Sequence, residues 1–186
     1  RPVVLVMCSA VAMWGCIGAT WAVDDWTWIV TNSHLYGQFW ESMTAHAEGL
    51  SYRAWRPAVW AYLWGDVAIF GLDPRPIHVV ALLYHVAAVL AGWKVVARVW
   101  GDDVGWWSSL IWGVHPIATS AICYAVQVSV PMVTFWLLAF VWFGLDKRLF
   151  LALVCLAFAA ASRETAILAG PMLWLVEAAC PTSRAS

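Results

Sequence analysis

Residues 2–23 contain no charged side chain, and two adjacent carboxylates, Asp24 and Asp25, follow them directly. A helix of about 20 apolar residues is long enough to cross the hydrocarbon core of a bilayer. A mostly polar stretch then continues to residue 56. The pattern predicts a first membrane span that ends where the two carboxylates meet water. We expect the later apolar segments to form walls around this acidic pair.

The composition of the chain indicates a membrane protein. Of its 186 residues, 63% are hydrophobic and only 11% are charged, whereas roughly a quarter of the residues of a soluble domain are charged. The formal net charge of −1 gives no basis for a polyanion-binding surface, so we expect no nucleic-acid partner. The 16 tryptophans fit a chain with much surface at the membrane–water interface, which this side chain favours.

The later apolar segments predict further spans. We expect them at residues 77–99, from residue 106 with a kink or break at Pro116, and at 132–145, 149–161 and 166–180. The last two are short, so 149–180 is either two tilted spans or one long broken helix. Residues 57–72 are also short and contain Asp66, which favours a helix lying at the membrane surface.

These segments predict an all-α integral membrane protein with about six transmembrane segments. Residues 1–186 form a single membrane domain, with the first span at 1–23, an outer loop bearing interfacial helices at 24–76, and the remaining spans at 77–180. We interpret the first segment as a retained anchor rather than a cleaved signal. The five cysteines are interpreted as small packing residues that form neither a disulfide framework nor a metal site.

Basic residues orient the predicted bundle. If consecutive spans run in opposite directions, six basic residues lie on the same side of the membrane: Arg1, Lys94, Arg98, Lys147, Arg148 and Arg184. An excess of lysine and arginine marks the cytoplasmic side of a membrane protein. We therefore predict a multi-pass protein of a prokaryotic inner membrane or its equivalent, with a cytoplasmic N-terminus and with Asp24 and Asp25 on the outer side.

Two charged pairs are candidates for chemistry. Asp24 and Asp25 either mark the wet end of a span or supply a general base or a ligand for a divalent metal, since partial desolvation raises the basicity of a carboxylate. Arg163 and Glu164 interrupt an apolar run. They form either a plain hairpin turn near the interface or a cavity wall in which the arginine holds an anionic head group.

Histidines offer weaker candidates. His115 precedes the helix-breaking Pro116, and it binds either a substrate or only the carbonyl groups that the break frees. His78 and His85 lie seven residues apart, hence on one face of a helix. A single histidine within the membrane can ligate a haem or a pigment, but packing between helices is the simpler interpretation for both.

Six motifs in order resemble those of a known family. The acidic pair after the first span is followed by residues 52–57 (YRAWRP), 70–74 (FGLDP), 77–85 (IHVVALLYH), 112–121 (WGVHPIATSA) and 161–165 (ASRET). This order resembles the N-terminal membrane module of the GT-C glycosyltransferases. The nearest branch is that of the protein O-mannosyltransferases and the tetratricopeptide-containing O-mannosyltransferase-like proteins.

The resemblance implies a function and a set of site residues. Family members transfer a sugar from a polyprenyl-phosphate carrier to an acceptor hydroxyl on the extracytoplasmic side. The acidic position after the first span is their catalytic base, or a metal ligand in one branch, so Asp24 and Asp25 would inherit that role. Arg56 or Arg163 would contact the lipid phosphate, and His115 and Glu164 match family motif positions of unassigned duty.

A second interpretation stays open. A polar residue and a glutamate that are usual in the family are absent here, where Ala118, Ser120 and Ala121 stand, and a basic–acidic pair is absent at residues 128–130. The chain would then be a non-catalytic structural membrane subunit derived from the same fold, packed against other subunits of a redox or pigment complex. That interpretation predicts a surface rich in Trp, Phe and small residues that is buried against other chains, and an empty or collapsed cavity at Asp24.

Overall fold

The computed structural model describes residues 1–48 and 56–179, and every regular element in these two ranges is helical. The all-α prediction is confirmed. The helices are α1 (Pro2–Met13), α2 (Val23–Asp25), α3 (Phe39–Glu48), α4 (Pro57–Phe70), α5 (Arg75–Trp100), α6 (Asp102–Gly113), α7 (Ala118–Cys123), α8 (Ser129–Leu145), α9 (Leu149–Ser162) and α10 (Ala169–Ala179). Short helical turns lie at Trp14–Gly18, Trp26–Val30, Ser33–Tyr36, Ala125–Val128 and Glu164–Leu168.

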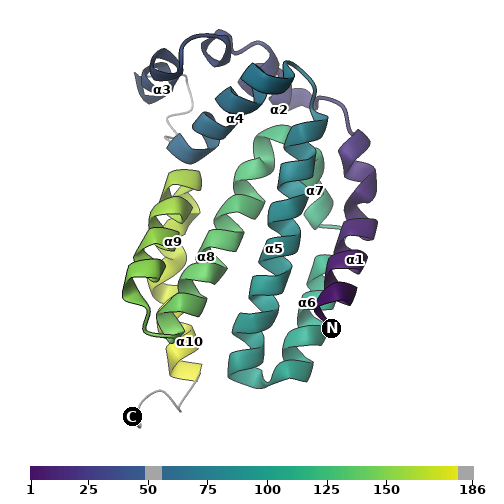
Figure 1. The fold of residues 1–186 in the computed structure, drawn as a ribbon, viewed down its shortest axis with the longest axis vertical. Helices are drawn as coiled ribbons and strands as arrows, with labels where there is room; N and C mark the ends of the chain where they lie inside the picture. The colour runs from purple at the N-terminus through teal and green to yellow at the C-terminus, as the bar shows by residue number, and fades with distance from the viewer. Residues whose placement is uncertain (49–55, 180–186) are drawn as a thin grey trace.

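Helix α5 is the axis of the bundle (Figure 1). It packs against α1 and α6 on one flank and against α8 on the other, and α9 and α10 pack on the far side of α8. Proline in its first turn suits the start of α5, because the N–H that proline lacks would have no partner there. Gly101 ends the helix with φ of 91°, a conformation that glycine adopts without a Cβ clash.

Close packing of α5 against α6 depends on glycine. A Cβ atom placed on Gly105 would lie only 2.7 Å from the backbone nitrogen of Ala97. A Cβ on Gly113 would lie 3.2 Å from both methyl groups of Val89. Small residues of this kind let two helix backbones approach closely, as they do in membrane bundles. The turn at Gly101 and the close approach at Gly105 and Gly113 therefore determine how α6 packs back against α5.

Two helical stretches of the described residues are long and apolar enough to cross a membrane. They are Arg75–Trp100 and Ala125–Leu145, the second of which joins a short turn to α8. Pro2–Gly18 and Leu149–Ser162 are apolar but shorter. The expected break at Pro116 is present, since α6 ends at Gly113 and α7 is a separate short helix. The number of about six spans stays a prediction.

The chain reverses after α9. Helix α10 packs on α8, and a Cβ atom on Gly144 at the end of α8 would meet the Cδ1 atom of Leu173 at 3.0 Å. Residues 149–179 are therefore two helices that run in opposite directions, with Arg163 and Glu164 at the turn between them (Figure 1). Of the two alternatives left by the sequence, one long broken helix is wrong for this range.

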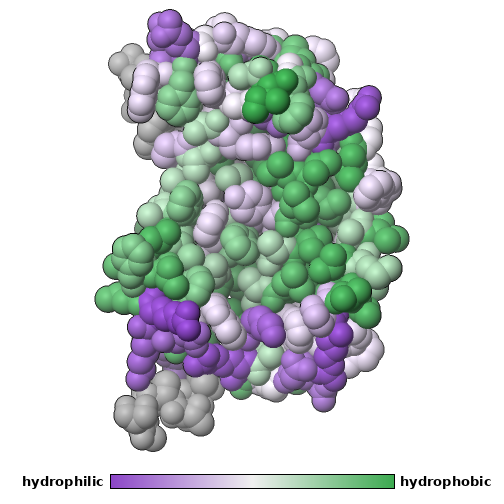
Figure 2. Space-filling model, viewed as in Figure 1, coloured by the Kyte–Doolittle hydropathy of each residue, from purple (hydrophilic) through white to green (hydrophobic). Residues whose placement is uncertain are grey.

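The two ends of the bundle differ. Helices α3 and α4 lie across one end, where the indole N–H of Trp64 donates to the Gly37 carbonyl at 2.9 Å (Figure 1). Basic residues lie at or near the opposite end, where α1 begins and α5 ends: Arg1, Lys94, Arg98, Lys147 and Arg148. Arg184 lies outside the described residues. Figure 2 shows apolar residues over the middle of one face and hydrophilic residues gathered towards its lower end.

Candidate functional site

The two adjacent aspartates have different environments. Asp24 is exposed, whereas Asp25 is fully buried. The Oδ2 atom of Asp25 accepts hydrogen bonds from the backbone N–H of Ala22 at 2.9 Å and of Ala125 at 3.3 Å. Its Oδ1 atom accepts one from the N–H of Val126 at 2.8 Å. Asp25 is therefore a structural anchor in this fold.

The partners of Asp25 explain why its carboxylate is buried. Ala125 and Val126 are the first residues of the helical stretch Ala125–Leu145. The first N–H groups of a helix have no partner within it, and the helix dipole favours a negative charge there. Asp25 caps this stretch from a position about 100 residues away in the chain. Asp25 thereby connects the segment that follows the first helix to the start of Ala125–Leu145.

A disulfide between Cys16 and Cys123 lies in the same region. It joins the turn after α1 to the end of α7, with the two Cα atoms 4.7 Å apart. The sequence-based interpretation of all five cysteines as packing residues is therefore wrong for this pair. Their separation of 107 residues gives no local signal, because the contact arises only when α7 folds back against the end of α1. The disulfide and Asp25 together hold the α7 segment in place.

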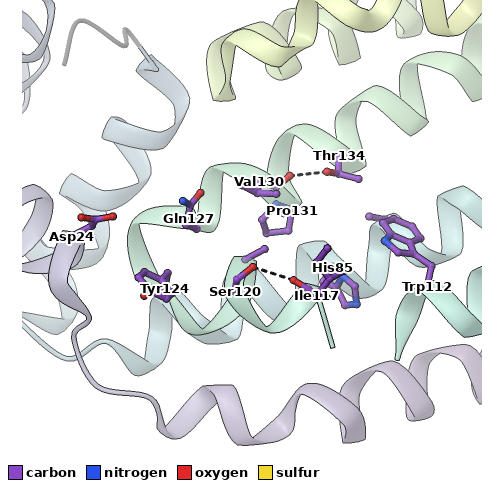
Figure 3. Close-up of a pocket in the computed structure, with 13 residues that line it drawn as sticks. Asp24, His85, Trp112, Ile117, Ser120, Tyr124, Gln127, Val130, Pro131 and Thr134 are labelled. Atoms are coloured by element: carbon purple, nitrogen blue, oxygen red, sulfur yellow. Dashed lines mark hydrogen bonds between the residues drawn. The ribbon is translucent and has the colours of Figure 1, made fainter. Parts of the chain in front are cut away.

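The larger of two cavities at this end has a volume of about 600 Å³. Asp24 lies at one end of it, and the lining continues past Tyr124, Gln127 and Pro131 to His85 and Trp112 at the other end (Figure 3). Helix α7 supplies one wall through Ala118, Ser120 and Ala121. The lining combines a few polar side chains with a larger apolar surface, the arrangement of a site that binds an amphipathic molecule.

A second cavity of about 350 Å³ adjoins the first. Asp24 and Gln127 line both cavities. Arg56 and Arg163 line the second one beside aromatic and aliphatic side chains: Trp28, Val59, Trp60, Leu63 and Val126. One exposed carboxylate and two guanidinium groups therefore share one hollow. Residues 24, 56 and 163 come from three distant parts of the sequence.

Hydrogen bonds fix the orientation of both arginines. The Nε and Nη2 atoms of Arg56 donate to the carboxylate of Glu164 at 3.0 and 2.6 Å. The Nη1 atom of Arg163 donates to the Gln127 Oε1 atom at 3.1 Å and to the Ser129 hydroxyl at 3.0 Å. A guanidinium group has five N–H donors, so each arginine retains donors for a ligand. A guanidinium group held in a fixed orientation can donate two parallel hydrogen bonds to a phosphate group.

The electrostatics of the arginine pair favour an anion. Burial lowers the pKa of Arg163, and the positive charge of Arg56 lowers it further. The hydrogen bond from Arg56 holds the pKa of Glu164 below its usual range, so this carboxylate stays ionised and balances one of the two cations. An anion in the second cavity would relieve the remaining repulsion between the guanidinium groups.

The three histidines considered in the sequence analysis do not line the second cavity, which Arg56 and Arg163 line. His115 is exposed and lines neither cavity, and its Nδ1 atom accepts the backbone N–H of Ile117 at 3.2 Å. His78 is buried, with its Nδ1–H donating to the Ile122 carbonyl at 2.7 Å. His85 lines the first cavity, and its Nε2–H donates to the Gly113 carbonyl at 3.1 Å. These bonds are packing contacts between segments.

The residues around Asp24 do not fit a divalent metal. Hard cations of this kind take several oxygen ligands, and within residues 1–48 and 56–179 no group of three or more histidine, cysteine, aspartate or glutamate side chains is placed to hold an ion. Both oxygens of Asp25 already accept backbone N–H groups. Asp24 alone is left, so we assign no step to a metal.

Gln127 is a site residue that the sequence analysis did not select. It lines both cavities and holds Arg163 in place. The sequence did contain a signal for this residue. Residues 118–145 are largely apolar, and Gln127 is the one amide side chain among them. Polar residues in such runs generally face a cavity or another helix rather than lipid.

Comparisons of the chain with protein-family models, with curated proteins and with solved structures find no match. The functional argument therefore depends on the geometry of the two cavities and on the sequence motifs.

Proposed function

We propose that this chain is a multi-pass membrane protein and the membrane module of a GT-C-like glycosyltransferase. It transfers a sugar from a polyprenyl-phosphate carrier to an acceptor hydroxyl on the extracytoplasmic side, with Asp24 as the general base. The observation that carries the proposal is that Asp24, Arg56 and Arg163 line one cavity, which adjoins a larger and mostly apolar one.

Exposed apolar side chains support the membrane assignment. Less than half of the most apolar part of α5 is buried, 44%, whereas the core helix of a soluble protein would be mostly buried. Large hydrophobic side chains are also exposed on several other helices: Met7, Val11, Ile111, Leu149, Phe150, Leu153 and Phe158. A contiguous surface of this kind needs a lipid or protein environment.

The disulfide and the basic residues support the same orientation. Disulfides persist in oxidising compartments, and the Cys16–Cys123 bond lies at the end that carries Asp24. Basic residues gather at or near the opposite end, which favours its placement in the cytoplasm. Both arguments support the proposal that the two cavities lie on the outer side of the membrane.

The proposed reaction uses three side chains. Asp24 accepts the proton of the acceptor hydroxyl as the hydroxyl oxygen attacks the C1 atom of the sugar. The bond between C1 and the phosphate oxygen breaks, and its electron pair leaves with the polyprenyl phosphate. Arg56 and Arg163 stabilise the negative charge on this leaving group through charge-assisted hydrogen bonds. Gln127 and Glu164 act as positioning residues that orient the two arginines.

The alternative of a non-catalytic subunit predicts an empty or collapsed cavity at Asp24. Cavities of about 600 and 350 Å³ at this residue weigh against a collapsed one. The exposed apolar side chains fit a contact with another subunit as well as with lipid. The grouping of Asp24, Arg56 and Arg163 around one cavity favours the transferase over the alternative.

The test is sugar transfer by Asp24→Asn. The protein in detergent is supplied with radiolabelled polyprenyl-phosphate mannose or glucose and with serine- and threonine-containing peptides. We expect at least about a hundredfold loss of transfer in Asp24→Asn, the usual range for removal of a general base, with an unchanged melting temperature. Asp73→Asn is the matched control, because Asp73 lines neither cavity. Transfer that survives in Asp24→Asn overturns the assignment of Asp24.

A further inference from the structure

A third hollow lies near the basic end of the bundle, remote from Asp24. It is a groove of about 450 Å³ between α5, α8 and the start of α1. Its walls are almost entirely apolar and include Leu90, Ala91, Phe135, Ala139 and Trp142, with Pro2 at one edge. Many of these side chains are only partly buried, so the groove opens at the surface of the bundle. Its volume is in the range of small-molecule sites.

Lys94 is the cation of this groove. Its side chain is exposed and contributes to the lining, and its Nζ atom lies 4.3 Å from the centre of the Trp93 ring. A cation–π contact at an exposed site is weak, and the ammonium group keeps its three N–H donors for another partner. None of the carboxylates in the described residues forms an ion pair with Lys94.

Three aspartates at this end, Asp102, Asp103 and Asp146, are already paired. Asp102 and Asp103 both bind the guanidinium group of Arg1, and Asp102 also accepts the indole N–H of Trp93 at 2.9 Å. Asp146 binds Arg98, whose guanidinium group lies 5.7 Å from the centre of the Trp142 ring. Lys94 is therefore the uncompensated charge on the groove.

We propose that this groove binds one anionic phospholipid of the cytoplasmic leaflet. An acyl chain lies along the apolar wall between α5 and α8, and the head-group phosphate accepts hydrogen bonds from Lys94. Basic pockets between membrane helices on the cytoplasmic side bind anionic head groups in this way. The proposal depends on the membrane orientation given above but not on the glycosyltransferase activity.

The shape of the groove supports a lipid chain as the occupant. Ala91 and Ala139 are small residues on facing helices, and they leave a channel that the aromatic walls of Phe135 and Trp142 border. Dispersion contacts with a flexible hydrocarbon chain need such a channel. A cation at one end of the channel then selects a negatively charged head group over a zwitterionic one.

Native mass spectrometry of the delipidated full chain tests the proposal. The protein is titrated with phosphatidylglycerol or with phosphatidylcholine of the same acyl chains, and bound lipids are counted. We expect one phosphatidylglycerol to be retained in preference to phosphatidylcholine. Lys94→Gln should reduce that preference about fivefold, the effect of one lysine near an anionic lipid. Lys147→Gln is the control, since Lys147 is exposed at the same end but does not line the groove.

A second variant tests the groove itself. Ala91→Phe fills the channel and should remove the retained lipid while Lys94 is intact. Equal retention of the two lipids, or an equal loss in Lys94→Gln and Lys147→Gln, overturns the proposal. A dimer that Ala91→Phe dissociates would also overturn it, because a second copy of the chain would then be the occupant. Asp24→Asn should retain the lipid fully, which separates this result from the outcome of the transferase test.

Discussion

At the scale of single residues, the acidic pair divides into a surface carboxylate and a buried one. Asp25 accepts three backbone N–H groups, two of them from the start of the stretch Ala125–Leu145. We expect Asp25→Asn to lower the free energy of unfolding by about 1–3 kcal/mol, because the amide –NH₂ faces N–H donors that are then left unsatisfied. Thermal unfolding in detergent measures this loss.

Asp24→Asn is the matched control for that measurement. Asp24 is exposed, and a substitution at such a position generally changes stability by less than about 0.5 kcal/mol. An equal loss of stability in the two variants would contradict the division of the pair into a surface carboxylate and a buried anchor. The sequence offered both Asp24 and Asp25 as the general base. It could not say which, because the partners of Asp25 lie about 100 residues along the chain.

Asp66 gives a prediction about pH. It lies on α4 with 5% of its surface exposed, and its Oδ2 atom has no hydrogen-bond partner among the described residues. Burial raises its pKa from 3.8 to about 6, although the Tyr62 hydroxyl at 3.3 Å opposes the shift. The folded state therefore binds this proton more tightly than the unfolded state does. Its contribution to stability is full below pH 3.8 and is lost as the pH rises through about 6.

Asp66→Asn removes this titration. We expect the variant to melt at a higher temperature than the parent protein at about pH 8, where the parent must keep a charged carboxylate buried. The difference should shrink as the pH is lowered towards about 4. Melting curves across that range, with Glu177→Gln as an exposed acidic control, measure it. A difference that does not vary with pH would show that folding does not raise the pKa of Asp66.

At the scale of helices, the hairpin of α5 and α6 depends on the absence of a side chain at residue 105. A Cβ atom there would meet the backbone of Ala97 at 2.7 Å and the Trp93 carbonyl oxygen at 2.8 Å. Backbone atoms cannot move without separating the two helices. We expect Gly105→Ala to lower the free energy of unfolding by about 1–3 kcal/mol, the usual cost of overpacking.

Gly65→Ala provides the control for this effect. Gly65 lies within α4, and a Cβ atom there has nothing within 4 Å. Alanine has the higher helix propensity by about 1 kcal/mol, so this variant should be neutral or more stable. Denaturant or thermal unfolding of the two variants compares them directly. A Gly105→Ala variant as stable as Gly65→Ala would show that α5 and α6 are not in close contact.

The positions of the helices follow well from the sequence, but their lengths do not. Apolar runs and the proline at residue 116 located the helices and one break. The region from residue 106 was expected to form one kinked or broken span, yet α6 stops at Gly113 and α7 is only six residues long. Hydropathy shows how apolar a segment is, but not where its helix ends. In the region from residue 106 to residue 128, the helix lengths depend on the Asp25 cap and the Cys16–Cys123 disulfide. Both are contacts between distant segments.

At the scale of the whole molecule, charge and redox chemistry support the same proposed orientation of the bundle. The described basic residues at the α1 end and the disulfide at the other end both favour a cytoplasmic N-terminus. The sequence predicted this orientation from the alternation of charged turns. The sequence predicted walls around the acidic pair. It could not predict which residues line the two cavities, because each is lined by segments that are distant in the chain.

Thiol labelling of intact cells tests the orientation. Leu72→Cys places a thiol on an exposed residue near α4, and Arg148→Cys places one on an exposed residue at the basic end. A membrane-impermeant maleimide should label Leu72→Cys in intact cells and Arg148→Cys only after the membrane is opened, with labelling of the parent chain subtracted. The reverse pattern would move Asp24 to the cytoplasm and exclude an extracytoplasmic transferase. Labelling of both in intact cells would show that α5 and α8 do not span the membrane, because these helices separate the two positions.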